Sequence, residues 1–470
     1  MRCKILAISG LALLAAGTAP LAAAPAPASY PLAEAQVLDL SKQLIALRTV
    51  RGEGNQTGAA LELVKAALVA GGWRADQVEI TPVDDTAYFI ATWPGTDPKL
   101  KPLVISGHMD VVEAKASDWE RDPFTPVVEN GYLFGRGASD MKFDAAMAAS
   151  SLIELRRQGY KPKRTIILQF SGDEETTMKT SRIVAERLKH AEMVINIDGG
   201  GGTLEEGTGK PLYWTWQGAE KTYNDYLLEV TNPGGHSSAP RPDNAIVQLA
   251  TALERIGSYR FPAELSPVTK AYFEQAARFE TDAKLAGAMR AFAANPEDEA
   301  ALAILRANQA YVGKVGTTCV PTMLSGGHAQ NALPQRATAN VNCRIFPGHS
   351  REEIRAELER VAAVPGLKVT DATGDESVAA PASPMRPDFL RAAERAIAKA
   401  RPGTPVFPMQ SSGATDSMWY RALGVDSYGA SATFSKDSDD YAHGLNERVA
   451  LSNIKPGLVY YLSLLTDLSK

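Results

Sequence analysis

The fold of this chain is decided by the stretch Thr165-Ile-Ile-Leu-Gln-Phe-Ser-Gly-Asp-Glu-Glu175, in which a short apolar run ends at two adjacent acidic residues. Apolar runs of similar length lie at residues 88–92, 103–106 and 193–197, and segments with helical spacing separate them. Short apolar runs between turn signals are consistent with buried strands. Strands that alternate with helices predict an α/β fold with a mostly parallel sheet and helices on both faces.

Residues that can bind a metal or transfer a proton follow several of these runs or lie in glycine-containing loops. They are Glu174 and Glu175 in the quoted stretch, His108 and Asp110 after residues 103–106, Asp198 after residues 193–197, Asp140 in the segment 135–140 and His443 in the segment 442–447. Open α/β sheets place their ligand crevice at the carboxyl ends of the strands, so we expect these side chains to meet there. The pattern predicts a metal site with enzymatic chemistry.

A hydrolytic centre with two metals needs two histidines, one bridging carboxylate and one terminal carboxylate for each metal. The chain offers one candidate for each position. His108 and Asp198 would serve one metal, Glu175 and His443 would serve the other, and Asp140 would bridge them. Because these ligands bind through oxygen or nitrogen, they do not distinguish Zn²⁺ from Co²⁺ or Mn²⁺.

Two acidic residues remain for roles beside the metals. Glu174 is the candidate general base, which would take a proton from the attacking water and pass it to the leaving amine. Asp110 stands two residues after His108 and would orient its imidazole ring. Each residue alone would also fit a structural role, and it is their shared place at predicted strand ends that favours an active site.

The length and composition predict more than one domain. The chain has 470 residues, of which 45% are hydrophobic and 22% charged, which is ordinary for a globular protein and too long for one core. We expect a catalytic domain formed by residues 29–219 and 376–470, with a lid or dimerisation domain at 220–375 inserted into it. An alanine-rich helical insertion is expected at about 258–312, and a solvated helical elaboration is its favoured interpretation.

The first 28 residues read as a secretory signal. Arg2 and Lys4 precede the apolar run 5–16, and Ala26-Pro-Ala28 fits a cleavage site. We therefore expect an exported protein, periplasmic or secreted, without a membrane segment after cleavage. The net charge is −5 and no basic stripe is present, which argues against nucleic acid as a partner.

Loss of the signal would leave two cysteines, Cys319 and Cys343. If the strands around them pair across a loop centred near Asn331, the two cysteines fall opposite each other. An oxidising compartment would allow one disulfide between them.

A set of motifs in order along the chain resembles one known family, the dinuclear-zinc amidohydrolases and metallopeptidases that include glutamate carboxypeptidase, aminoacylase, succinyl-diaminopimelate desuccinylase, carnosinase and carboxypeptidase S. The motifs are Gly107-His-Met-Asp110, Gly135-Arg-Gly-Ala-Ser-Asp-Met-Lys142, Gly172-Asp-Glu-Glu175, Asp198, Gly234-Gly-His-Ser-Ser238, Asn331-Ala-Leu-Pro334, Cys343-Arg-Ile-Phe-Pro-Gly348, Ser412-Gly-Ala-Thr-Asp416 and His443. They extend over nearly the whole chain after the signal, and together they are highly specific.

The resemblance implies a zinc-exopeptidase-like fold with two Zn²⁺ per subunit and the ligand roles given above. It implies that His236 in the lid reaches the active site of a partner subunit and stabilises the oxyanion, and hence a homodimer. It further implies that Arg344 binds the free carboxylate of the substrate. Asn331, Ser412 and Thr415 would be additional substrate contacts.

The expected function is therefore that of an exported exopeptidase, a dipeptidase or carboxypeptidase that acts on small peptides with a free carboxylate. The alternative within the family is an N-acyl-amino-acid amidohydrolase. Asp198 stands where many relatives have glutamate, which resembles the aminopeptidase, dipeptidase and carboxypeptidase S branches. Outside this class, a periplasmic solute-binding protein and a family member without catalysis are the alternatives, and the complete ligand set argues against both.

Overall fold

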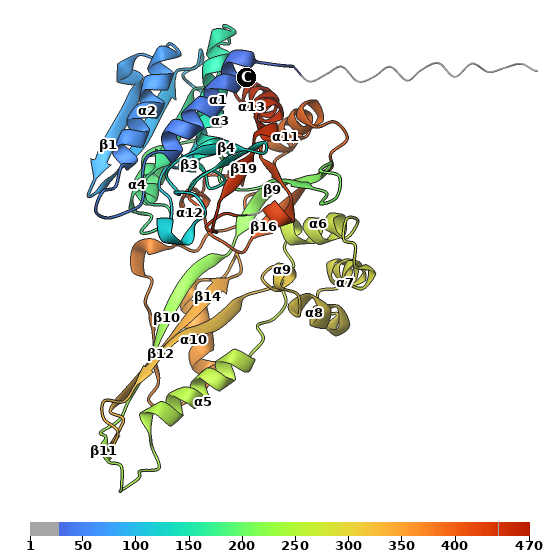
Figure 1. Ribbon diagram of the computed structural model, residues 1–470. Helices are drawn as coiled ribbons and strands as arrows, with labels where there is room; N and C mark the ends of the chain where they lie inside the picture. The colour runs from blue at the N-terminus through green and yellow to red at the C-terminus, as the bar shows by residue number, and fades with distance from the viewer. Residues whose placement is uncertain (1–27, 440) are drawn as a thin grey trace, which may run out of the picture.

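The computed structural model describes residues 28–439 and 441–470, so all but the last residue of the predicted signal lies outside it. Figure 1 shows two parts, a large sheet with its helices above and a narrow lid below. The large sheet has the strand order β1-β2-β6-β3-β7-β17-β9-β8-β18, and β16 pairs with β9. Within the described residues, no helix has the length and apolarity that a membrane crossing requires.

The centre of the large sheet is parallel. Its middle strands are β6 (Ile166–Ser171), β3 (Leu103–His108), β7 (Met193–Asn196) and β17 (Ser427–Gly429), and each pairs in parallel with the next. The outer strands β1 (Val78–Val83) and β2 (Thr86–Trp93) are antiparallel. On the other side lie β8 (Gly201–Leu204), β9 (Pro211–Glu220), β16 (Val406–Ser411) and β18 (Phe434–Ser435). The predicted α/β class is confirmed.

Helices cover both faces of this sheet, as expected. One face carries α1 (Pro31–Ile45), α2 (Thr57–Ala70), α3 (Lys142–Arg157), α11 (Pro387–Ala400) and α13 (Ile454–Leu468), which share one apolar core with the strands. The other face carries α4 (Lys179–Leu188) and α12 (Ser417–Ala422) around a second core. A small sheet of β4 (Val127–Glu129), β5 (Tyr132–Phe134) and β19 (Arg448–Ala450) lies beside them.

The start of α3 corrects a sequence prediction. Asp144 is a good N-cap residue by type, so the sequence alone predicts a helix that begins there. The helix instead begins at Lys142 with no side-chain cap, and Asp144 lies inside its first turn, fully buried. Its carboxylate accepts hydrogen bonds from the hydroxyls of Ser431 and Thr433, both at 3.2 Å. These partners are almost 290 residues away in the sequence, so no local pattern reveals them.

The lid consists of a four-stranded antiparallel sheet with two helices packed on one face. The strand order is β12 (Thr318–Gly326), β14 (Arg336–Ile345), β10 (Thr222–Thr231) and β15 (Lys368–Asp371), and the helices are α5 (Ala245–Ser258) and α10 (Arg351–Ala362). Alternate residues of β10, namely Tyr226, Leu228 and Val230, enter the core. The short strands β11 (Gly235–His236) and β13 (Ala332–Leu333) pair at the far end of the lid (Figure 1).

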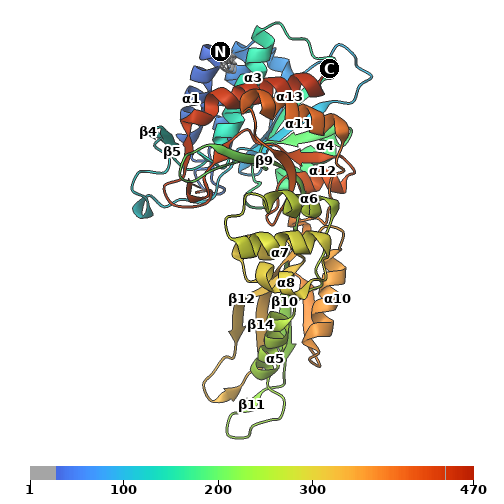
Figure 2. The same cartoon turned by 90° about the vertical axis from the view of Figure 1, so that its right-hand side faces the viewer.

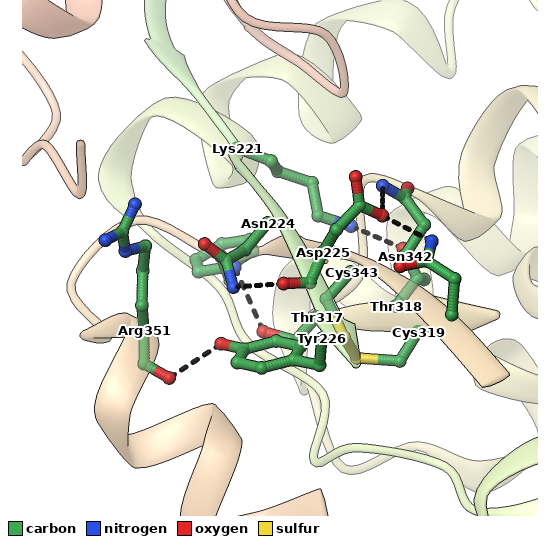
Figure 3. The surroundings of a disulfide bond; sticks show 12 residues. Lys221, Asn224, Asp225, Tyr226, Thr317, Thr318, Cys319, Asn342, Cys343 and Arg351 are labelled. Atoms are coloured by element: carbon green, nitrogen blue, oxygen red, sulfur yellow. Dashed lines mark hydrogen bonds between the residues drawn. A yellow bond between two sulfur atoms is a disulfide. The ribbon is translucent and has the colours of Figure 1, made fainter. Parts of the chain in front are cut away.

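A disulfide joins Cys319 of β12 to Cys343 of β14, which confirms the predicted pairing (Figure 3). The two cysteines are direct partners in the antiparallel register. Beside the bond, the buried Lys221 at the junction with the large sheet donates a hydrogen bond of 3.0 Å to the Thr318 hydroxyl. The disulfide therefore lies where the lid meets the catalytic part.

The helical insertion is not the solvated elaboration that its sequence favoured. It forms α6 (Pro267–Ala276), α7 (Ala283–Ala294), α8 (Glu299–Arg306) and α9 (Gln309–Val312), and Figure 2 shows α7 and α8 below α6, alongside the lid. Phe273, Met289 and Phe292 form a buried core with Phe407 of β16. The insertion is thus anchored to the large sheet through aromatic packing.

Candidate metal centre

The carboxyl ends of neighbouring parallel strands bring the predicted site residues together. His108 is the last residue of β3, and Glu174 and Glu175 follow the end of β6. Asp198 stands two residues after β7. Because β6, β3 and β7 are adjacent and parallel, their following loops meet at one edge of the sheet. The loops that carry Asp140 and His443 complete the cluster.

Asp140 occupies the middle of this cluster. Its Oδ1 lies 3.0 Å from Nε2 of His108, and its Oδ2 lies 3.2 Å from Nε2 of His443. On the first side, Asp198 Oδ1 is 3.7 Å from His108 Nε2. On the second side, Glu175 Oε1 is 2.8 Å from His443 Nε2. Asp140 thus presents one oxygen to each histidine, which is the arrangement required of a bridging carboxylate.

The donor set fits two divalent cations. The ligand atoms of His108, Asp140 and Asp198 lie within 4.8 Å of one another, and so do those of Asp140, Glu175 and His443. Imidazole nitrogens and carboxylate oxygens are the ligands that catalytic zinc sites use. These five residues would therefore fit the metals that the sequence predicts.

Burial concentrates charge in the cluster. Burial raises the pKa of Asp198 to about 7 and raises that of Glu174 well above its ordinary value. Burial alone would lower the pKa of His108, but Asp198 and the other carboxylates raise it well above its usual range. Hydrogen bonds to Asp140 and Glu175 raise the pKa of His443 to about 10. Bound cations would displace these protons, because metal ligands bind in their deprotonated form.

Asp110 orients the cluster in two ways. Nδ1 of His108 lies 2.9 Å from the backbone carbonyl of Asp110 and 3.5 Å from its carboxylate, so the imidazole is held mainly by the main chain. The carboxylate itself accepts the backbone N–H groups of Glu174 at 3.1 Å and Glu175 at 3.0 Å. The predicted orienting role thus extends from the histidine to the glutamate pair.

The two glutamates differ in their surroundings. Glu175 is joined to His443, whereas Glu174 is buried and lies beside His108. Burial, with the nearby Asp198 and Glu175 carboxylates, raises the pKa of Glu174. A carboxylate with a raised pKa is suited to accept a proton near neutral pH. This contrast supports Glu175 as a ligand and Glu174 as the base.

Arg344 and Ser412 meet at the junction between lid and catalytic part. Arg344 Nη1 lies 3.4 Å from the backbone carbonyl of Ser412, and its guanidinium stacks over the ring of Tyr223 at 4.7 Å. Thr415 is different, because its hydroxyl donates to Glu220 at 2.8 Å and accepts from Asn196 at 3.1 Å. The Thr415 hydroxyl, predicted as a substrate contact, therefore belongs to a buried network.

His236 and Asn331 lie together at the tip of the lid. Both are exposed, and β11 and β13 pair there, with the N–H of Ser237 donating to the carbonyl of Asn331 at 2.9 Å. Figure 1 shows this tip, at β11, at the end of the lid that is far from the large sheet, whose strands carry the cluster. A single subunit therefore does not bring these two residues to its own metal centre.

Sequence reasoning missed two features beside the cluster. Glu447 is completely buried and accepts hydrogen bonds from the loop that carries Asp140; its closeness to His443 in the sequence is the signal that could have revealed it. The second feature is a cavity of about 560 Å³, whose walls come from loops distant in the sequence. Its lining includes Asp140, Met141, Ile197, Asp198, Met409 and Phe434.

Comparison with known proteins identifies relatives of this chain. Residues 104–467 match the model of peptidase family M20/M25/M40. The chain is 26% identical over 395 residues to a probable carboxypeptidase S-like 2 of Dictyostelium discoideum. The match covers 81% of this chain and 74% of that protein. It is 24% identical over 384 residues to the human N-fatty-acyl-amino acid synthase/hydrolase PM20D1, which covers 79% of this chain and 75% of the relative.

Solved structures show the same fold. An M20 family metallo-carboxypeptidase from Sulfolobus solfataricus superposes with a TM-score of 0.69 at 19% identity, over 92% of this chain and 98% of that one. Human carnosine dipeptidase 1 gives a TM-score of 0.65 at 16% identity, over 93% and 97% of the two chains. Because the family model spans most of the sequence, this chain belongs to peptidase family M20/M25/M40 and is a metal-dependent hydrolase.

Proposed function

We propose that this hydrolase is a two-metal exopeptidase or amidohydrolase that cleaves an amide bond in a small substrate with a free carboxylate. The observation that carries the proposal is the carboxylate of Asp140, which directs one oxygen to each of two histidines. Bound divalent cations, Zn²⁺ with Co²⁺ or Mn²⁺ as alternatives, would supply a Lewis acid for the scissile carbonyl and lower the pKa of water. Because the family is one of hydrolases, the interpretation as a periplasmic solute-binding protein is wrong.

The protein groups contribute proton transfer and orientation. Glu174 takes the proton of the attacking water and passes it to the leaving amine. Asp110 binds the backbone N–H of Glu174 through its carboxylate and the ring of His108 through its carbonyl. It therefore fixes the position of the base relative to the metal ligand. The oxyanion that develops would be stabilised by His236 of a second subunit.

The substrate's two sides would meet different surfaces. Arg344 offers a fork of N–H donors to a carboxylate. Within the described chain, neither Arg344 nor Ser412 lines the cavity beside Asp198. Because Arg344 would bind the carboxylate side of the substrate, the cavity is suited to the other side, the acyl group of the amide. Its volume favours a second candidate, an N-acyl-amino-acid amidohydrolase, and the name of the human relative supports the same substrate class.

A substrate panel separates these candidates. Metal-replete protein would be assayed with dipeptides, with N-acetyl amino acids and with N-acyl amino acids of increasing chain length. An exopeptidase should turn over the dipeptides most efficiently. An amidohydrolase should prefer acyl groups, with kcat/KM rising as the acyl chain fills the cavity. Failure to cleave any member would overturn the proposal.

Arg344→Lys is expected to raise KM for substrates with a free carboxylate by roughly tenfold or more. Lysine keeps the charge but loses the bidentate fork and the stacking on Tyr223. Steady-state kinetics should show no such change for the matched C-terminal amides. An equal loss for acids and amides would remove Arg344 from the carboxylate site.

We further propose that the active form is a homodimer joined through the lid. The lid's edge strand β12 exposes Val320, Met323 and Leu324, which are 55%, 71% and 69% accessible. Ile246 and Val247 of α5 are exposed too. An unpaired edge strand with apolar side chains is suited to pair with its own copy about a two-fold axis. Such pairing would bring the His236 tip of one subunit towards the other.

Hybrid dimers test the transfer of His236 between subunits. His236→Ala and Glu174→Gln are each expected to be inactive alone. After mixing and subunit exchange, one site of each hybrid should contain both intact groups and recover activity. Isotopically distinct subunits and native mass spectrometry would show that hybrids form. Inactive hybrids would contradict the proposal.

We also propose that the protein works outside the cytoplasm. The disulfide between Cys319 and Cys343 supports this, since such bonds persist in oxidising compartments. The signal predicted at residues 1–28 points the same way.

A further inference from the structure

Glu447 has an unusual number of hydrogen-bond donors for one carboxylate. Its Oε1 accepts from the backbone N–H of Ser139 at 2.8 Å, from the Ser139 hydroxyl at 3.0 Å and from the N–H of Asp140 at 3.0 Å. Its Oε2 accepts from Arg136 Nη1 at 2.7 Å and from the N–H of Gly137 at 3.0 Å. The side chain is fully buried, so these five donors replace water completely.

The same two segments are joined by their main chains. The N–H of Gly135 donates to the carbonyl of Glu447 at 3.0 Å, and Arg136 Nη2 donates to the carbonyl of His443 at 3.3 Å. Directly after Glu447, β19 pairs with β5, so Arg448 lies opposite Phe134. The segment that carries His443 is therefore tied along its length to the loop that carries Asp140.

This arrangement fixes two ligands with one carboxylate. Asp140 must direct separate oxygens to His108 and His443, and small rotations of its loop would misplace both. The loop turns through Gly137 at φ +88°, and its N–H groups converge on Glu447. Glu447 follows His443 by four positions, so the same anchor sets the distance between the bridging carboxylate and the second histidine.

We propose that Glu447 is the positioning residue that couples Asp140 to His443 and thereby sets the affinity of the cation position formed by Asp140, Glu175 and His443. The proposal rests on the two-cation centre of the proposed function. Removal of an outer partner of metal ligands typically weakens metal binding by about 10–100-fold. The position formed by His108 and Asp198 should be affected less, because Asp110 holds His108 independently.

The test is cation binding by Glu447→Gln. Glutamine keeps the shape of the side chain. Its amide N–H₂ would, however, place donors against the backbone N–H groups and the guanidinium whose hydrogen bonds Glu447 accepts. Chelator competition with Zn²⁺ should show one cation weakened by about 10–100-fold and the other affected less. The absorption spectrum of the Co²⁺-loaded protein should lose the contribution of one position. Glu447→Asp, which keeps the charge, should recover part of the affinity and serves if the glutamine variant does not fold.

Glu220→Gln is the matched control. Glu220 is also buried and ion-paired, at 2.9 Å from Arg421, but it lies in the network around Thr415. It should lower the unfolding temperature and leave both cations in place. Unchanged binding of both cations in the Glu447 variants, or equal weakening in Glu220→Gln, would overturn the proposal. An unaltered protein that binds fewer than two cations would instead overturn the two-cation centre, and this inference with it.

Discussion

Glu174→Gln is expected to lower kcat by at least two orders of magnitude while both cations stay bound. General-base transfer contributes typically about 10²–10⁴-fold, and glutamine cannot accept the proton. The variant should still bind substrate, because the two side chains have nearly the same shape and the Asp110 carboxylate still accepts the backbone N–H at this position. Stopped-flow kinetics beside metal analysis by mass spectrometry would measure both quantities.

The decisive comparison for Glu174 is metal content. Two cations per chain with almost no turnover would support the general base. If Glu174→Gln loses a cation, the residue is a ligand, and its assignment must be exchanged with that of Glu175. The proximity of His108 to both glutamates makes this a real test of geometry.

Glu175→Gln is expected to lose one cation and most activity, and to regain part of that activity in excess Zn²⁺. Its carboxylate lies 2.8 Å from His443 and shares that histidine with Asp140. A neutral amide is a weaker ligand for a divalent cation than a carboxylate, so the affinity falls while the site's shape remains. Activity measured against free Zn²⁺ concentration should show a midpoint shifted to higher metal. A variant that keeps two tightly bound cations would exclude Glu175 as a ligand.

The core of the fold and the cluster could be predicted because both follow from strand ends. Apolar runs such as residues 103–106 identify buried parallel strands, and the residues after them must gather at one edge of the sheet. His108, Glu175 and Asp198 are brought together for this reason. Their spacing in the sequence carries the information.

Features that depend on distant partners could not be predicted. Glu447 is one acidic residue in a loop, and its donors lie about 310 residues earlier. Asp144 has the side chain of an N-cap residue. It lies inside the helix instead, where its carboxylate accepts hydrogen bonds from hydroxyls of a distant loop. The sequence of the helical insertion is alanine-rich and favours a solvated surface element. Its aromatic residues pack against Phe407, which lies on a much later strand and cannot be identified from the insertion alone.

If the protein forms the homodimer proposed above, the disulfide has a consequence for the lid of a separated subunit. Strand β12 is an edge with exposed apolar side chains, and an isolated edge of this kind is prone to peel away and to recruit other chains. The bond between Cys319 and Cys343 tethers the start of β12 to β14, so a separated subunit keeps this strand in register. In the homodimer proposed above, this covalent link would protect a separated subunit from aggregation until a partner covers its edge strand.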